Sequence, residues 1–436
     1  MSEIERKLTE YDIEFISYQF TTIFGDLKSV AFPVELWEDL STGQGVDGSS
    51  LGFLHTEQSD MIAVPDKKTF GIYPWEPNVA HFICDMVDNA YNPHPACPRG
   101  VLKRVIKQAK DMGFLYKTRP ELEWYFVQKE DDGTYTPLDY GQYMDTHPFD
   151  PYSDLRFLIA AAMRDMHMGV KTIHHECGPC QHEIEFTVLD ALYQADNVQR
   201  AKVIAKALSR FDDMICTFMP KPYIGEAGSG LHVHQYLTDL DGNNIFADKE
   251  NGISDILRYF IGGILKHVNE MTAVINPITN SYKRLVPGHE APVYTAWGVA
   301  NRTALIRVPG YEKKARIEYR AGDGAMNIYL ASALLLAAGL DGIKKKIEPI
   351  EPTTRNIETL TYDERQKMRI RSLPGSLTAA LDLMEEGGFV KEVLGDNIYD
   401  IFLAKKREEC KIADTKHAES QDIGLLWEHE YYLERV

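Results

Sequence analysis

Four short segments of the sequence carry ionisable residues two positions apart, and this spacing places side chains on the same face of a β-strand. In chain order they contain Glu121 and Glu123, Glu183 and Glu185, His232 and His234, and Arg316, Glu318 and Arg320. The residues between them are mostly apolar, so the opposite strand faces are expected to be buried. Carboxylates held together in partial burial repel one another unless a cation lies between them. The pattern indicates a metal site, although any one segment alone also fits a solvated strand face.

The ligand types favour a hard cation. Carboxylate oxygens with an occasional imidazole suit Mg²⁺ or Mn²⁺, whereas zinc prefers thiolates or several histidines. Glu176 lies shortly before the second pair and adds another carboxylate. These carboxylates and histidines are numerous enough to bind two neighbouring metal ions.

Arginines cluster on segments that adjoin these residues. Arg302 and Arg307 lie in NRTALIRVP, and Arg316 and Arg320 lie in ARIEYR. Guanidinium groups bind phosphate oxygens through two parallel hydrogen bonds. The sequence has neither a GxxxxGK[ST] loop nor a GxGxxG turn between a strand and a helix, so the P-loop and Rossmann classes lose their main support. Metals and arginines would then hold the phosphates of ATP in a phosphoryl-transfer site.

The net charge and composition of the chain argue against several classes of protein. A net charge of −18 over 436 residues opposes binding to nucleic acid or an anionic membrane, and it suits a protein that binds cations or simply stays soluble. No apolar run approaches the roughly 18 residues of a membrane helix, and the charged N-terminus has no signal peptide, so a cytoplasmic protein is expected. Cys177 and Cys180 form a CxxC without the second pair that a zinc site would need.

The elements that must position these residues fall into two domains. Turn formers and prolines in 89–100 separate a short β-rich part, with a hairpin near Gly25 and Asp26, from a longer part in which strands and helices alternate. We expect an N-terminal domain over 1–96 and a catalytic domain over 97–436 that ends in a helical tail. Helices are expected at 153–168, 191–214, 253–270 and 327–346.

Motifs along essentially the whole chain resemble, in the same order, those of the glutamine synthetase family in its class I-like form. They are VDGSSLGFLHTEQSDMIAVPD, PELEWYF, HHECGPCQHEIEF, GSGLHVHQ, NSYKRLVPGHEAPVY, NRTALIRVP and RIEYRAGDGAMNIYL. The resemblance implies an α+β fold: a small β-grasp-like N-terminal domain, then a larger catalytic domain whose curved antiparallel sheet is flanked by helices. It also implies a homo-oligomer, usually a dodecamer of two hexameric rings, with sites shared between subunits.

The resemblance also assigns residues to ligands by motif position. One metal ion would be held by Glu123, Glu176 and Glu183, and a second by Glu121, His232 and Glu318. The phosphates of ATP would face His234, Arg302, Arg307 and Arg316, and glutamate would be held by Gly228, Arg284 and Arg320. Ammonium would be bound by Tyr143, Glu176 and Glu290 with Asp47 and Ser50 of the adjacent subunit. The residues implied in catalysis are Asp47, Glu290 and Arg302.

The implied reaction is ATP-dependent ligation of ammonia to glutamate in nitrogen metabolism. The side-chain carboxylate of glutamate attacks the terminal phosphate of ATP, and an amine then attacks the resulting γ-glutamyl phosphate. Two further functions stay open: a γ-glutamyl ligase for a small organic amine, and a catalytically inactive regulatory homologue. The intact ammonium set argues against a bulky amine, and the complete set of metal ligands argues against an inactive homologue.

The chain departs from the family pattern at a few positions. Ala227 stands where the family has an asparagine before Gly-Ser-Gly, which removes a donor from the amino-acid pocket. Gly322, Gly324 and Ile328 alter a stretch that is proline-rich in the family. Cys180 stands where the family usually has glycine or another small residue; a packed thiol is the preferred interpretation, and an oxidation-sensitive site is the alternative.

Overall fold

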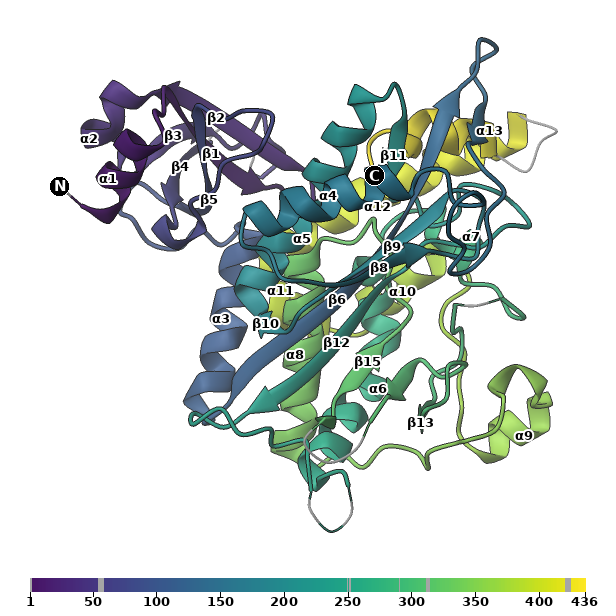
Figure 1. Cartoon of the computed structure of the whole chain (residues 1–436). Coiled ribbons are helices and arrows are strands. Elements are labelled where there is room, and N and C mark those ends of the chain that lie inside the picture. The colour runs from purple at the N-terminus through teal and green to yellow at the C-terminus, as the bar shows by residue number, and fades with distance from the viewer. Residues whose placement is uncertain are drawn as a thin grey trace.

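The computed structural model describes residues 2–53, 59–248, 250, 252–289, 291–310, 314–419 and 425–436. Its N-terminal part is a small domain on a five-stranded sheet with strand order β2-β1-β5-β4-β3 (Figure 1). The elements are α1 (Glu3–Glu10), β1 (Phe15–Thr21), β2 (Leu27–Pro33), η1 (Val34–Leu36), α2 (Trp37–Leu40), β3 (Gln44–Asp47), β4 (Asp60–Pro65), η3 (Lys67–Thr69) and β5 (Val79–Val87). Neighbouring strands are antiparallel except β1 and β5, which are parallel.

The small domain has a core of its own. The hairpin predicted near Gly25 and Asp26 is confirmed: it joins β1 to β2, and Gly25 has a φ of +93°, a conformation that glycine adopts without strain. Tyr18 of β1 is fully buried and packs edge-on against Phe32 of β2 and Phe82 of β5. Such contacts between rings on paired strands fix the register of the sheet.

The rest of the chain forms a larger domain around a ten-stranded sheet. Its strands are β6 (Leu115–Lys129), β7 (Tyr135–Pro137), β8 (Val170–His175), β9 (Gln181–Phe186), β10 (Leu189–Asp190), β11 (Ile215–Thr217), β12 (Leu231–Thr238), β13 (Trp297–Val299), β14 (Ile306–Val308) and β15 (Ile317–Tyr319). The main order is β13-β14-β15-β12-β6-β9-β8, and β7, β10 and β11 also pair with β6. All pairs are antiparallel except β13 and β14. The predicted antiparallel catalytic sheet is thereby confirmed.

The helices of the larger domain include those predicted from the sequence. They are α3 (Pro98–Asp111), α4 (Ser153–Asp165), α5 (Ala191–Phe211), α6 (Asp255–Ile275), α7 (Ser281–Arg284), α8 (Ile328–Lys345), α9 (Tyr362–Lys367), α10 (Leu377–Glu386), α11 (Phe389–Leu394), α12 (Asp396–Glu419) and α13 (Leu425–Glu428), with a 3₁₀ turn η5 (Ile357–Thr359) and a π-helix η6 (His429–Leu433). The four expected helices are α4, α5, α6 and α8, and α6 runs beyond its predicted end. None of the described helices combines the length and apolar character needed to cross a membrane.

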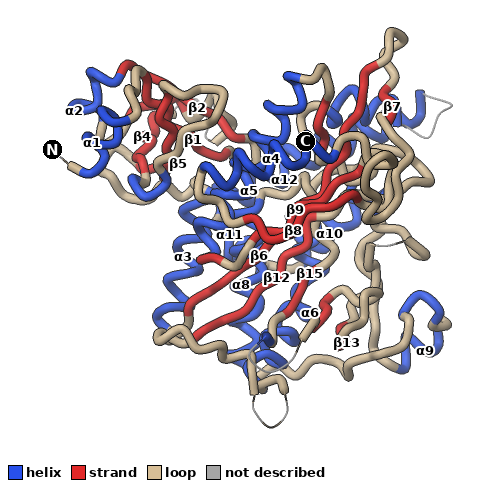
Figure 2. The backbone as a smooth tube through the Cα atoms, in the orientation of Figure 1, coloured by secondary structure: helices blue, strands red, loops and turns tan. Residues whose placement is uncertain are grey.

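Helices cover one face of the large sheet. Figures 1 and 2 show α3, α6 and α8 behind the long strands β6 and β12. On β6, Leu122, Trp124 and Phe126 are buried in the main hydrophobic core. Because successive side chains of a strand alternate between its faces, Glu121 and Glu123 project from the opposite face. The large sheet therefore presents a row of ionisable residues on the face away from these helices.

Arg99, near the start of α3, ties the two domains together. Its guanidinium contacts Asp66 at 2.8 Å and Asp85 at 2.7 Å in the N-terminal domain, and Asp196 of α5 at 2.9 Å. The side chains of Arg99 and Asp196 are each only 3% exposed, so water does not screen this pair. The predicted boundary after residue 96 falls between β5 and α3 and stays a prediction.

We expect Arg99→Met to lower the free energy of unfolding by about 3–5 kcal/mol, because it leaves the buried carboxylate of Asp196 without its cationic partner. Urea unfolding followed by circular dichroism measures the change. Lys103→Met is the matched control, since Lys103 also contacts Asp85 but is 46% exposed, and we expect a loss of about 0–1 kcal/mol. Equal losses in the two variants would contradict the role given to Arg99.

Candidate active site

The strand register brings the ionisable pairs together around β6. Glu121 of β6 lies opposite Glu185 of β9 and also opposite His232 of β12. Glu123 lies opposite Glu183 of β9. The two-residue spacing within each strand predicts which ionisable residues share a face. The pairing of β6 with β9 and β12 then places these residues next to one another. The result is a compact patch of carboxylates and imidazoles on one face of the sheet.

The patch continues across β12 toward β15 and β14. His234 lies opposite Glu318, which in turn lies opposite Arg307. Ligand atoms of Glu121, His234 and Glu318 lie within 4.8 Å of one another. His234 Nε2 is 2.6 Å from Glu121, and the side chain of Arg316 donates to His234 Nδ1 at 3.3 Å. Because arginine can only donate, His234 carries its proton on Nε2 and donates it to Glu121.

His232 lies among three carboxylates. Its Nδ1 is 3.3 Å from Glu121 and 3.9 Å from an oxygen of Glu123 and of Glu318. The sequence motifs placed His232 with Glu121 and Glu318 at a metal ion and His234 at the phosphates. The structure places both imidazoles against Glu121, with His234 in the closer contact. The division of the two rings between metal and phosphate stays a prediction.

A second group of ligand atoms forms where β8 turns into β9. Atoms of His174, Glu176 and Glu183 lie within 4.8 Å of one another, and His174 Nε2 is 2.9 Å from Glu176. Glu123, the third carboxylate predicted here, lies opposite Glu183 on the neighbouring strand. His174 was not among the predicted ligands, although it stands two residues before Glu176, the spacing that identified the others.

Negative charge is unbalanced at the β8–β9 end of the patch. Burial, followed by the charges of Glu123, Glu121 and Glu176, raises the pKa of Glu183 well above its usual range. Burial likewise raises the pKa of Glu123, and the charge of Glu176 adds to this shift. Neighbouring carboxylates whose ionisation is opposed in this way fit a bound divalent cation, which would offset their repulsion.

The carboxylates nearer β15 have hydrogen-bond donors instead, which are imidazoles for Glu121 and guanidinium groups for Glu318. Burial alone would raise the pKa of Glu121, but the hydrogen bonds with the two imidazoles outweigh it and the pKa lies well below its usual range. Glu318 accepts hydrogen bonds from Arg307 at 2.6 Å and from Arg320 at 3.2 Å. The patch therefore has a cationic end at β14 and β15 and an acidic end at β8 and β9.

The arginines predicted to face phosphates lie at the cationic end. Arg307 and Arg316 are partly buried, and burial lowers the pKa of both. Arg302 is exposed, and its charge acts on Arg307. Arg119 of β6 was not predicted, and its guanidinium lies 2.5 Å from Glu185. The two-residue spacing within a strand could not link Arg119 to Glu185, because the two residues lie on the neighbouring strands β6 and β9.

The residues predicted to hold glutamate meet beside this patch. A Cβ on Gly228 would lie 2.8 Å from the carbonyl oxygen of Pro220, so glycine allows the backbone to approach here. Arg284 donates to the carbonyl of Arg320 at 3.3 Å and to that of the next residue at 2.8 Å. Ala227 precedes this loop and offers no side-chain donor.

The residues predicted to bind ammonium are not all brought together within one chain. Tyr143 packs edge-on against His174, with ring centroids 5.3 Å apart, and so lies beside the second ligand group. Ser50 donates to Asp47 at 2.5 Å in the N-terminal domain. Figure 1 shows β3, which ends at Asp47, well apart from β8 and β9. Glu290 lies outside the described residues.

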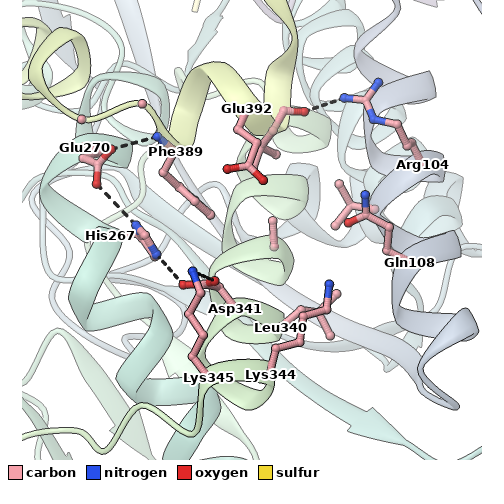
Figure 3. A pocket seen from close by; sticks show the side chains of 15 residues that line it. Arg104, Gln108, His267, Glu270, Leu340, Asp341, Lys344, Lys345, Phe389 and Glu392 are labelled. Carbon is pink, nitrogen blue, oxygen red and sulfur yellow. Dashed lines mark hydrogen bonds and ion pairs between the residues drawn. The ribbon is translucent and has the colours of Figure 1, made fainter.

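A cavity of about 390 Å³ lies elsewhere, among α3, α6, α8 and α11 (Figure 3). His267 stacks on Phe389 there, with centroids 3.9 Å apart, and its imidazole nitrogens lie 2.9 Å from Asp341 and 3.4 Å from Glu270. The residues that line this cavity belong to the helical layer and include none of those in the patch on the sheet. We therefore expect the catalysed reaction to take place on the sheet face that points away from α3, α6 and α8.

Known proteins are similar to this chain in sequence and in fold. Residues 12–89 match the family model described as glutamine synthetase, β-grasp domain, and residues 95–422 match that of the glutamine synthetase catalytic domain. A glutamine synthetase of Methanosarcina mazei is 44% identical over 99% of this chain and 97% of its own length. One of Thermotoga maritima is 41% identical over 99% of this chain and 98% of its own.

Solved structures agree with these matches. A ligand-free structure of GmaS is similar with a TM-score of 0.87 at 29% identity, over 99% of each chain. A complex of GmaS with ADP has a TM-score of 0.88 at the same identity. The matched family models indicate an enzyme that uses ATP and a divalent metal, and the candidate ligand groups on the sheet face fit that class. The chain belongs to the glutamine synthetase family, and the predicted α+β fold with a β-grasp domain is confirmed.

We expect Glu183→Gln to weaken Mn²⁺ binding by about 10-fold or more, as loss of a ligand or its support commonly does. Because the pKa of Glu183 is raised, this carboxyl must lose a proton when it binds a cation, so Mn²⁺ binding should release protons and strengthen as the pH rises. Isothermal titration calorimetry in buffers of different ionisation enthalpy measures both effects.

Glu185→Gln is the matched control for this experiment. Glu185 lies on the same strand face, but Arg119 and Lys171 each lie 2.5 Å from it. We expect its loss to change Mn²⁺ affinity and proton release much less. Binding without proton release, or an equal loss of affinity in the two variants, would speak against a cation at Glu183.

Proposed function

We propose that this protein catalyses the ATP-dependent ligation of ammonia to the side-chain carboxylate of glutamate, giving glutamine, ADP and phosphate. The observation that carries the proposal is the patch of carboxylates, imidazoles and arginines on one sheet face of a glutamine synthetase fold. Curated glutamine synthetases from 38% to 44% identical over nearly the whole chain support a glutamate–ammonia ligase rather than a ligase for an organic amine.

The charge distribution across the sheet suits the two halves of the reaction. In the first half, a carboxylate oxygen of glutamate attacks the terminal phosphorus of ATP and ADP leaves. Arg307 and Arg316, with the exposed Arg302, supply donors for the phosphate oxygens at the cationic end, and His234 faces the same phosphates. In the second half, the nitrogen of ammonia attacks the carbonyl carbon of γ-glutamyl phosphate and phosphate leaves. The acidic end attracts the ammonium ion from which ammonia comes.

We assign the metal ligands as the motifs imply. Glu123, Glu176 and Glu183 hold one divalent cation, and Glu121, His232 and Glu318 hold another. The predominance of oxygen ligands supports Mg²⁺ or Mn²⁺, with two or more ions in each site. When bound, such cations supply positive charge that offsets the charge of the transferring phosphoryl group.

The remaining residues position the other two substrates. Arg284 and Arg320, with the backbone at Gly228, hold the amino acid, and Ala227 leaves this pocket with one donor fewer than in the family pattern. Ammonium is bound by Tyr143, Glu176 and Glu290 together with Asp47 and Ser50 of the adjacent subunit, and Asp47, Glu290 and Arg302 take part in catalysis. Hydrogen bonds from Ser50 and then Ser49 hold the pKa of Asp47 below its usual range, so it is ionised and able to attract a cation.

A shared site makes assembly part of the function. Because β3 and its Asp47 lie apart from the ligand groups of their own chain, the ammonium site needs the N-terminal domain of another subunit. We propose a homo-oligomer, a dodecamer of two hexameric rings, that acts in the cytoplasm on small molecules. The net charge of −18 supports the absence of a nucleic-acid partner.

The choice of amine tests the proposed function directly. Phosphate release from ATP in the presence of glutamate is measured with ammonia and with a panel of small amines. We expect turnover with ammonia and weak or no turnover with methylamine and larger amines. Strong turnover with an organic amine and none with ammonia would favour a γ-glutamylamide ligase, and no turnover with any amine would favour an inactive regulatory homologue.

Mixed oligomers test the sharing of the site. Asp47→Ala and Glu183→Gln are each expected to lose most activity, because each removes a group from every site of a uniform oligomer. When the two variants are co-expressed, some sites combine an intact N-terminal domain with an intact catalytic domain, and we expect activity to recover in part. Glu123→Gln mixed with Glu183→Gln is the control and should recover none, because both changes lie in the same half-site. Recovery in neither mixture would contradict a shared site.

A further inference from the structure

The loop between β8 and β9 carries two cysteines in the sequence CGPC, Cys177 and Cys180. We propose that they form a reversible dithiol–disulfide couple, a modification site that controls the activity through the neighbouring Glu176. The control of activity rests on the proposed function, in which Glu176 binds both metal and ammonium. Formation of the disulfide itself depends only on the loop and the groups around it.

The backbone holds the two ends of this loop together. The amide of Glu176 donates to the carbonyl of Gln181 at 2.7 Å, and the amide of Gln181 donates to the carbonyl of Gly178 at 3.1 Å. Cys177 and Cys180 are therefore the first and last residues of a four-residue hairpin loop. A disulfide requires Cα atoms about 4.4–6.8 Å apart, and a tight turn allows residues three apart to reach that span.

The two thiols differ in the way that a stepwise oxidation requires. Of the six cysteines of the chain, Cys177 is exposed and the other five are buried. Cys180 has no exposed surface. An external disulfide therefore reaches Cys177 first, and Cys180 is left to resolve the mixed disulfide from inside the protein. Thiols in a CxxC are commonly more reactive than an isolated cysteine.

A buried carboxylate lies beside Cys180. An oxygen of Asp139, the sulfur of Cys180 and a ring nitrogen of His182 lie within 4.8 Å of one another. Asp139 is only 7% exposed; its Oδ1 accepts from the Cys180 amide at 2.6 Å, and its Oδ2 has no hydrogen-bond partner. Burial and then the charge of Asp139 raise the pKa of the Cys180 thiol, so the thiol keeps its proton until it attacks. Burial alone would raise the pKa of Asp139, but hydrogen bonds from His175 and from the amides of Gly141 and Cys180 outweigh it and lower the pKa to about 2, so this carboxylate stays ionised and does not act as the base.

The same three side chains do not suit a metal ion. Arg156 lies 2.7 Å from His182 Nδ1, and because arginine can only donate, the proton of the neutral imidazole lies on Nε2. Burial, followed by the charge of Arg156, lowers the pKa of His182 well below its usual range, so the ring is neutral. Its Nε2–H lies 3.8 Å from the sulfur of Cys180 and leaves no lone pair free for a cation. Thiol chemistry is therefore favoured over metal binding here.

The oxidation proceeds in two exchanges. The Cys177 thiolate attacks one sulfur of an external disulfide, the external S–S bond breaks, and one thiol leaves. Cys180 then loses its proton and attacks the sulfur of Cys177, the mixed S–S bond breaks, and the second external thiolate leaves and takes up a proton. The two cysteines lose two electrons and two protons, and the external disulfide is reduced to two thiols. A low-molecular-weight or protein disulfide serves as the oxidant, and excess thiol reverses the reaction.

The disulfide would disturb the acidic end of the patch. Cys177 lies at the surface while the sulfur of Cys180 points into the core, so joining them requires the loop to move. The amide of Cys177 donates to a carboxylate oxygen of Glu176 at 3.0 Å, and the amide of Glu176 closes the loop. Movement of the loop therefore displaces Glu176 and with it a proposed ligand of metal and ammonium.

The test exposes the full-length protein to glutathione disulfide and maps disulfides by peptide mass spectrometry. We expect a Cys177–Cys180 bond, a loss of ammonia-dependent activity of about 10- to 100-fold, as a displacement of about 1 Å can cause, and recovery with dithiothreitol. Cys177→Ser and Cys180→Gly should keep their activity under oxidation. Glycine suits position 180, where φ is +54°. Cys216→Ser, which removes a buried thiol elsewhere, should stay as sensitive as the parent protein.

The outcomes separate this inference from the proposed function. Reduced protein without ammonia-dependent activity would count against the proposed function, while the mapped bond and the Mn²⁺ affinity of the oxidised form would still test the couple. Failure to form the bond, a persistent glutathione adduct on Cys177, or a bond that changes neither activity nor Mn²⁺ affinity would overturn the inference. Loss of activity in oxidised Cys177→Ser would place the sensitive thiol elsewhere and overturn it as well.

Discussion

Mutual repulsion among buried carboxylates is the constraint on which the rest of the site depends. Glu121 and Glu123 of β6 and Glu183 of β9 are held on one face of two paired strands, although their charges oppose one another. The opposite face carries Leu122 and Trp124 of β6 and Ile184 of β9 in the hydrophobic core, so neither strand can turn its carboxylates away without exposing apolar side chains. The fold thereby holds the carboxylates in a geometry that a cation can stabilise.

Positive charge is distributed unequally around these carboxylates. The guanidinium groups near β14 and β15 pair with Glu318, and two imidazoles pair with Glu121, whereas Glu183 lies mainly among other carboxylates. One end of the patch therefore suits anionic phosphates and the other suits cations. A reaction that consumes both a nucleotide and an ammonium ion needs both environments within reach of one amino-acid substrate.

The hairpin between β8 and β9 lies at the acidic end and connects several features. It carries Glu176 at its base, Tyr143 packs against His174 beside it, and Asp139 anchors its last residue through the Cys180 amide. The loop therefore links the ligand group on the open face to a buried polar cluster behind it. The proposed disulfide within this short loop would therefore affect both Glu176, in the ligand group, and Cys180, in the buried polar cluster.

The sequence by itself predicted which ionisable residues share a strand face and where the main helices lie, because the two-residue alternation of strands and the helical period are local properties. Family motifs added the antiparallel catalytic sheet, which the structure confirms, and the ligand assignments, which remain proposals. Only the tertiary structure decided which pairs face each other, since strand register depends on packing across distant segments. Arg119 reaches Glu185 and His174 lies opposite Glu183 for that reason. The separation of Asp47 from the patch likewise appears only once both domains have folded, because it depends on how their sheets are joined.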